Sequence, residues 1–104
     1  MIKASELRNG KVPVCIRNDY VFFLEFFEGF LWFHSNVSKW SAQVKKSYRR
    51  DFDLLEELVG KPIFVLIRNE DTKLARFAKA TGWFEKCQIS LLDGTKAFIY
   101  TNKV

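Results

Sequence analysis

Two aromatic runs joined by a two-residue turn restrict the possible folds of this chain more than any other feature. The runs Tyr20 to Phe27 and Phe30 to His34 are of strand length, and Glu28-Gly29 between them is typical of a tight turn. A shorter run, Val12 to Ile16, precedes them across the turn residues Arg17-Asn18-Asp19. Strands connected so closely pair as an antiparallel meander, and the nearly continuous apolar run 20–27 predicts a strand buried on both faces.

From Ser41 onward the apolar residues recur every three to four positions instead of every second position. This period predicts a long amphipathic helix over about residues 40 to 58, which ends at Gly60 before Pro62. The side of the helix that faces the core is predicted to carry Val44, Tyr48, Phe52, Leu55 and Val59.

After this helix the sequence predicts a strand and a second helix. The continuous apolar run Ile63 to Ile67 is typical of a central buried strand. Asn69 is the predicted N-cap of the second helix, because two acidic residues follow it and favour the positive end of the helix dipole. Leu74 and Ala78 belong to the predicted buried side of this helix, and Gly82 is its predicted stop.

The chain is predicted to close with a hairpin. Its two strands are expected over residues 83–92 and 96–101, with Asp93-Gly94 as the turn. The complete order is β-β-β-α-β-α-β-β, which predicts an α+β fold with a mixed sheet and helices packed on it. The expected organisation is a single domain over residues 1–104 with an N-terminal arm over residues 1–11.

The composition excludes several classes of protein. With 104 residues, of which 48% are hydrophobic, the chain has the size of one domain and is too apolar for a disordered protein. Its longest run without a formal charge, Gly29 to Ser38, is ten residues, so we expect no transmembrane helix and no membrane partner. The N-terminus carries Glu6 and has no long apolar stretch, which argues against a secretory signal.

The cysteines and the histidine argue against several kinds of reactive site. Cys15 and Cys87 each lie in an apolar run and are predicted to be buried, reduced thiols of a cytosolic protein. His34 is the only histidine, which argues against a metal centre and against a catalytic triad.

The stretch Asn69 to Trp83 combines an Asn, a helix, and a Gly followed by an aromatic residue. It resembles the late motif of the GNAT (Gcn5-related N-acetyltransferase) family, and the element order resembles the central and C-terminal part of that fold. Within the family the chain is similar to short GNAT-like proteins of tailed bacteriophages, including internal virion and head-assembly proteins. This similarity extends to Leu31 to His34 and to Trp40 to Tyr48, and it covers residues 20–101.

Three departures from the family pattern point away from acetyl transfer. Active members hold the pyrophosphate of acetyl-CoA on backbone N–H groups of a glycine-rich turn, whereas residues 35–43 contain no glycine and include Val37 and Trp40. Active members often carry a proton-donating Tyr four residues before the late Gly, where this chain has Ala78. The family's N-terminal strand and two helices are also missing, so the resemblance implies a truncated GNAT-like scaffold with no catalytic residues and no cofactor.

The alternative is that acetyl-CoA still binds at the equivalent positions. The residues that the resemblance then implies for the cofactor are Ser35, Asn36, Val37, Ser41, Ala42 and Asn69.

The first half of the long helix is a candidate interaction surface. Basic residues come first and acidic residues second, which is the reverse of what the helix dipole favours. Such a helix suits an acidic protein surface, a phosphate group or nucleic acid, in keeping with the net charge of +5, although a solvated helix face is the simpler interpretation. The predicted surface consists of Lys39, Trp40, Lys45, Lys46, Arg49 and Arg50.

Other polar and aromatic residues have simpler predicted roles. Glu25 is either a general base or, more simply, a solvent-facing residue paired with a lysine, and Glu28 is a turn residue. Trp83 is expected in the core, and Trp40 is expected to be the most exposed tryptophan. The helices can cover only one face of the aromatic meander, which leaves the other for self-association or docking.

These observations predict a non-catalytic GNAT-like phage protein that acts by protein–protein contact. Virion or head assembly is the expected setting, with inhibition of a host defence protein as a variant, in the host cytoplasm or the virion. A protein partner or self-association is expected, and no metal. The first alternative is a minimal acyl-CoA-dependent N-acetyltransferase, and the second is a nucleic-acid-binding protein that uses the basic helix.

Overall fold

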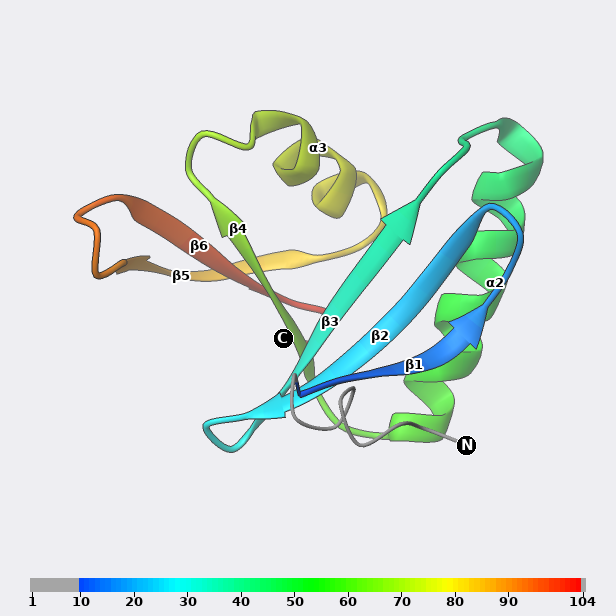
Figure 1. Cartoon of the computed structure of the whole chain (residues 1–104), viewed down its shortest axis with the longest axis horizontal. Coiled ribbons are helices and arrows are strands. Elements are labelled where there is room, and N and C mark those ends of the chain that lie inside the picture. The colour runs from blue at the N-terminus through cyan, green and yellow to red at the C-terminus, as the bar shows by residue number, and fades with distance from the viewer. Residues whose placement is uncertain (1–9, 104) are drawn as a thin grey trace. The chain divides into compact units, whose positions relative to one another are not determined.

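The computed structural model describes residues 10–103 of the chain. They form two compact units, one that ends at Lys61 and one that begins at Pro62 (Figure 1). The predicted N-terminal arm falls on residues 1–9, which lie outside the described residues, and on residues 10 and 11, of which Lys11 already belongs to the first strand. In the part of the chain that the structure describes, no helix has the length and apolar character needed to cross a membrane.

The first unit begins with the predicted antiparallel meander. Its strands are β1 (Lys11–Ile16), β2 (Tyr20–Phe27) and β3 (Phe30–Val37), and β2 pairs with both of the others. β3 continues beyond the predicted end at His34, because Tyr20 at the start of β2 still pairs with Val37. Residues 35–37 are therefore part of a strand and not of the predicted turn.

The helix of the first unit is α2 (Ala42–Val59), close to its predicted position. The hydroxyl of Ser41 accepts a hydrogen bond from the Val44 N–H and caps the first turn. Gly60 ends the helix as predicted, in a left-handed conformation with φ of 69°, and its N–H donates to the carbonyl of Glu56.

Aromatic rings join α2 to one face of the meander. The Phe22 ring lies 4.7 Å from that of Tyr48, and the Phe33 ring lies 5.1 Å from that of Phe52. Figure 1 shows α2 along this face. Of the five residues predicted for the inner side of the helix, all except the half-buried Val59 are buried.

β2 is buried on one face, and the prediction of burial on both faces is wrong. Tyr20 and Phe22 point toward α2 and are buried, whereas Phe23 and Glu25 alternate with them and are only half-buried. The reason is that the described part of this unit contains a single helix, which covers only one side of the meander.

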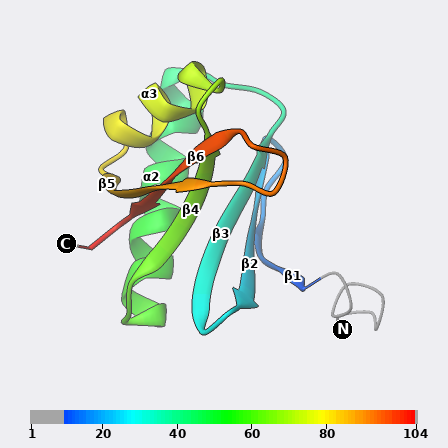
Figure 2. The ribbon, with the colours of Figure 1, turned by 90° about the vertical axis from the view of Figure 1, so that its left-hand side faces the viewer.

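The second unit contains β4 (Ile63–Arg68), α3 (Thr72–Ala80), β5 (Phe84–Ser90) and β6 (Lys96–Thr101), seen from two sides in Figures 1 and 2. Its strands lie in the order β4-β6-β5, and β6 is antiparallel to both neighbours. The structure confirms the predicted α+β class and the element order. The prediction of a buried strand at β4 is confirmed for Ile63, Phe64 and Ile67, whereas Leu66 is 44% exposed.

The start of α3 and the ends of β5 differ from the prediction, because the groups at these positions form other hydrogen bonds. The N-cap of α3 is Asp71 and not Asn69: the Asp71 carboxylate accepts from the Leu74 N–H, while the Asn69 N–H donates to the carbonyl of Lys96. β5 is shorter than predicted, because the Trp83 N–H is used at the end of α3 and residue 91 belongs to the turn before β6.

Candidate interaction site

A buried carboxylate on α2 organises the polar centre of the first unit. Asp51 lies in the middle of α2 and is only 6% exposed, which is unusual for a carboxylate. Arg17 follows directly after β1 and meets it from the strand side. The Nε of Arg17 donates to Oδ2 of Asp51 at 2.9 Å, and Nη2 donates to Oδ1 at 3.0 Å. This two-point geometry holds the guanidinium in a fixed orientation.

Two further side chains contact the Asp51 carboxylate, and a third contacts one of these two. The Tyr20 hydroxyl donates to Oδ2 of Asp51. Because this bond uses the only hydroxyl proton of Tyr20, its oxygen is the acceptor for the Ser47 hydroxyl at 2.7 Å. The Cys15 thiol lies 3.7 Å from the same Oδ2. The cluster therefore joins β1, β2 and α2 through one buried carboxylate.

The electrostatics of the cluster favour a permanently charged ion pair. Hydrogen bonds from Arg17 hold the pKa of Asp51 at about 2, below its usual 3.8, against the opposing effect of burial. Burial, reinforced by the Asp51 charge, raises the pKa of the Cys15 thiol, and burial likewise raises the pKa of the Tyr20 hydroxyl. Cys15 is therefore a poor nucleophile at neutral pH, and the cluster offers a fixed cation instead of a reactive group.

An apolar groove lies beside this cluster, between β1 and α2. Its volume is about 260 Å³, and Arg17 and Asp51 form its polar end. Val14 and Ile16 on β1 are 41% and 69% exposed, and Leu54 and Leu58 on α2 are 53% and 76% exposed. We call these four aliphatic residues together with Arg17 the β1–α2 groove.

This site was not predicted from the sequence, although the sequence contains a signal for it. Asp51 is one of the acidic residues that follow the basic ones along the long helix, and no separate role was predicted for it. Asp51 follows Tyr48 by three residues and precedes Leu55 by four, which places it on the inner side of the helix. A buried acid at such a position requires a cationic or hydrogen-bond-donating partner, and Arg17 is that partner.

The prediction that both cysteines are buried is wrong. Cys15 is half-buried, and Cys87 is exposed; both are free thiols. Cys87 is exposed because β5 pairs only with β6 among the described residues and six of its seven residues are exposed.

The six residues of the predicted interaction surface are all exposed: Lys39 and Trp40 directly precede α2, and the four others lie in its first half. Trp40 is 44% exposed, as predicted, and its ring packs edge-on against Tyr48 at 5.7 Å. Arg49 forms an ion pair with Asp53 at 3.2 Å, which offsets part of the positive charge. The surface consists of Lys39, Trp40, Lys45, Lys46, Arg49 and Arg50, and its binding role stays a prediction.

The residues implied for acetyl-CoA fall in three places. Three of them lie in the last part of β3, where the Ser35 hydroxyl accepts a hydrogen bond from the Tyr48 hydroxyl at 3.0 Å. Two more lie at the start of α2, where Ser41 already caps the Val44 N–H. Asn69 belongs to the second unit. The set is Ser35, Asn36, Val37, Ser41, Ala42 and Asn69.

The remaining predicted residues have structural partners. Glu25 pairs with His34 at 2.9 Å, so the expected lysine partner is wrong. Glu28 occupies the β2–β3 turn as predicted, with φ of 54°. Trp83 is buried in the second unit, as predicted. Among residues 10–103, no three His, Cys, Asp or Glu side chains gather as a metal ion would require.

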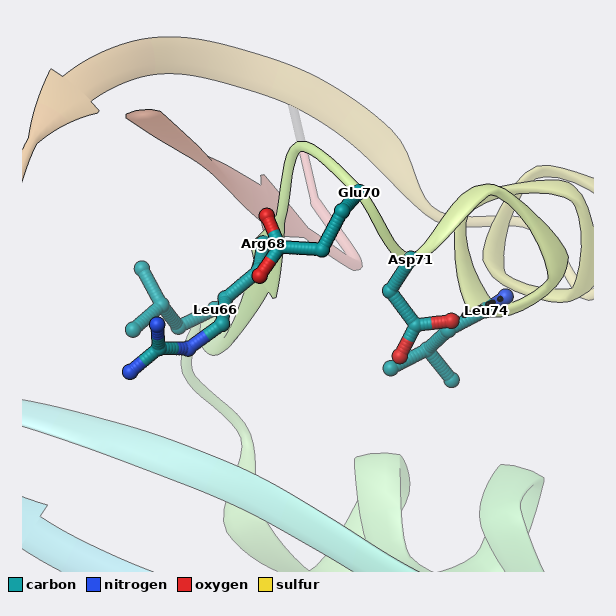
Figure 3. A pocket seen from close by; sticks show the side chains of 5 residues that line it. All are labelled: Leu66, Arg68, Glu70, Asp71 and Leu74. Carbon is teal, nitrogen blue, oxygen red and sulfur yellow. Dashed lines mark hydrogen bonds between the residues drawn. The ribbon is translucent and has the colours of Figure 1, made fainter. Parts of the chain in front are cut away.

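A second cavity lies within the second unit, at the end of β4 and the start of α3. Its volume is about 440 Å³ (Figure 3). Figure 3 shows the carboxylates of Glu70 and Asp71 on either side of this space, with Leu66 and Leu74 beside them. Arg68 also lines it and lies 3.5 Å from Asp93. Since Asp71 is already the N-cap of α3, its carboxylate has a structural role here.

The comparisons with known proteins concern the fold. No protein-family model and no curated protein matches the sequence. Among solved structures, the chain is a distant match to a protein described as a "putative acetyltransferase" from Sphaerobacter thermophilus DSM 20745, with 15% sequence identity and a TM-score of 0.44. The match covers 80% of this chain and 59% of the other, so the chain spans less than two thirds of that protein's length. A likeness this distant says nothing about activity.

Proposed function

We propose that this protein is a non-catalytic GNAT-like protein that acts through contact with other proteins, in phage virion or head assembly. The phage setting depends on the sequence resemblance, and inhibition of a host defence protein is a variant of the same contact function. The proposed sites of action are the host cytoplasm and the virion. The observation that carries the contact function is the aromatic end of the β2–β3 hairpin.

Three phenylalanines are exposed at this hairpin end. Phe26 is 69%, Phe27 is 58% and Phe30 is 48% exposed. Phe27 pairs with Phe30 across the turn, and the carbonyl of Phe27 accepts a hydrogen bond from the indole of Trp32 at 3.1 Å. The rings therefore sit on an ordered turn, so their docking costs little backbone entropy. Grouped exposed aromatic residues favour a protein contact over a solvated surface.

The start of α2 supports a function without acetyl-CoA. The hydroxyl of Ser41 accepts the hydrogen bond of the Val44 N–H. This N–H is one of the helix N-terminal donors that would otherwise be open to a pyrophosphate. The Trp40 side chain packs on Tyr48 beside the same turn. Ala78, at the position of the family's proton donor, is buried and has no group that can transfer a proton.

Self-association and binding of an apolar dye test the proposal. We expect the protein to associate with rising concentration in sedimentation velocity and to bind the dye. Changing Phe26 and Phe27 together to Ser should weaken both signals, since the change removes exposed apolar surface and leaves the core intact. Leu92→Ser is the matched control, because Leu92 is fully exposed on the other unit. A wild-type protein that stays a clean monomer and binds no dye would contradict the proposal.

A further inference from the structure

We propose that the β1–α2 groove binds an extended segment of a partner protein in which aliphatic side chains adjoin a carboxylate. This inference deepens the proposed function and rests on it, because it names the chemistry of the partner and a second contact surface. Three features of the groove support it: its size, its exposed aliphatic walls and the Arg17 N–H donors at its polar end.

The walls of the groove suit small aliphatic side chains. Its four aliphatic residues are between 41% and 76% exposed, although they face a common space and come from two elements. Single exposed leucines are ordinary on protein surfaces, but four aliphatic residues around one hollow mark a binding surface. The volume of about 260 Å³ lies below the range of roughly 300–1,000 Å³ that is usual for small-molecule sites. The groove therefore fits one or two side chains of a peptide better than a cofactor.

The polar end of the groove presents hydrogen-bond donors and no accessible carboxylate. A guanidinium has five N–H groups, and Arg17 uses its Nε and one Nη2 hydrogen on Asp51. Within residues 10–103 the other N–H groups have no hydrogen-bond partner, and the Arg17 side chain is 52% exposed. The Asp51 side chain is only 5% exposed, so an incoming cation cannot reach it. The groove consequently selects an acceptor with negative charge, and a carboxylate matches the planar fork of arginine.

The Arg17 guanidinium is already held in a fixed orientation before a partner binds. The bidentate bond to Asp51 fixes the guanidinium, and Asp51 is itself held by Tyr20. Little side-chain entropy is therefore lost when a carboxylate binds to Arg17.

Backbone pairing with β1 is a poorer explanation for this surface. β1 pairs only with β2 among the described residues, so its other edge has no strand partner there. However, Pro13 has no N–H, and the register shifts between Pro13 and Cys15, which places a bulge at Val14. Proline and bulges protect strand edges from the addition of another strand. Recognition through side chains in the groove is therefore favoured over strand addition or edge pairing with a second copy.

A display library of random short peptides, selected against the immobilised full chain, tests the inference. We expect the enriched peptides to carry Leu, Ile or Val close to Asp or Glu. A synthetic peptide of the enriched sequence should lose at least about tenfold in affinity when its acid is replaced by the corresponding amide. Fluorescence anisotropy measures these affinities, and chemical-shift changes at Ile16, Arg17 and Leu58 would locate the peptide.

Matched variants separate the groove from the rest of the surface. Leu58→Ser should weaken binding of the synthetic peptide by about tenfold, and Leu92→Ser should leave it unchanged. The paired variant Arg17→Gln/Asp51→Asn removes the cation without leaving a lone buried carboxylate, and it should bind the acidic peptide and its amide equally well. If that variant does not fold, Arg17→Lys serves instead, since it retains a positive charge and loses the fork of donors.

Several results would overturn the inference. In the selection, these are the absence of enriched peptides or the enrichment of basic peptides. For the variant, it is an unchanged peptide affinity of Leu58→Ser. If octanoate binds more tightly than the peptide, the groove is instead a fatty-acid site. The double change of Phe26 and Phe27 to Ser should not affect peptide binding. If the hairpin end fails its own test while the peptide still binds the groove, only the aromatic contact is wrong.

Discussion

Replacing Asp51 by Asn should destabilise the first unit in a pH-dependent way. The ion pair with Arg17 keeps the pKa of Asp51 at about 2 in the folded protein, against the usual 3.8. Each pKa unit corresponds to about 1.4 kcal/mol, so the charged form contributes about 2 kcal/mol to the free energy of unfolding. Because Arg17 is half-exposed and can be hydrated when its partner is lost, we expect a cost near this value and below the 3–5 kcal/mol that is typical of a fully buried pair.

The sign of the pH dependence follows from the lowered pKa. The stabilisation is present above about pH 4 and is lost as the pH falls toward 2, since the unfolded chain, with its ordinary pKa, then takes up a proton that the folded protein does not yet bind. Urea unfolding followed by far-ultraviolet circular dichroism, at a series of pH values, measures the difference between wild type and Asp51→Asn. This difference should be about 2 kcal/mol near neutral pH and should shrink steadily over the acid range.

A matched control distinguishes this pair from an ordinary surface ion pair. Asp53 lies two residues away on α2, is exposed and pairs with Arg49. Asp53→Asn should change the free energy of unfolding by less than about 0.5 kcal/mol at any pH. Equal effects of the two substitutions, or a difference for Asp51→Asn that does not depend on pH, would refute the reasoning.

The other predictions concern ligands and a helix end. Acetyl-CoA at millimolar concentration should leave the melting temperature unchanged, and a clear rise would support the acetyltransferase alternative by mass action. Duplex DNA at physiological salt should migrate unchanged in a gel with the protein; retardation that disappears when Lys45, Lys46, Arg49 and Arg50 are changed to Ala would instead establish the nucleic-acid alternative. Gly60→Ala should cost about 1 kcal/mol in urea unfolding, because φ of 69° strains a residue with a Cβ, and an unchanged midpoint would contradict this.

The elements were predictable where local sequence decides them. The β2 and β6 boundaries agree with the structure, because turn residues stand directly at the ends of their apolar runs. The prediction was less accurate where an end depends on a partner. β3 extends to Val37 because β2 is long enough to pair with it. Asn69 is not the N-cap of α3 because its N–H bonds to β6.

The candidate site was only partly predictable. The exposed basic residues of α2 follow from a periodic pattern, which assigns each helical residue to a side. The exposure of Trp40, which precedes the helix, was predicted from its polar neighbours Lys39 and Ser41. The groove could not be predicted in the same way, because its walls come from β1 and α2, which are separated by two strands in the sequence. Exposure of Ile16 and Leu58 depends on which surfaces the rest of the chain happens to cover.

The order of strands and helices, the meander and the ends of the long helix were thus determined by the sequence alone, since each depends on residues within a few positions of one another. Only the tertiary structure decided that Asp51 is buried, that Arg17 is half-exposed with N–H groups that no described residue uses, and that four exposed aliphatic side chains line one hollow. The physical reason is that burial and charge pairing depend on contacts between distant segments, whereas periodicity and turns depend on neighbouring residues.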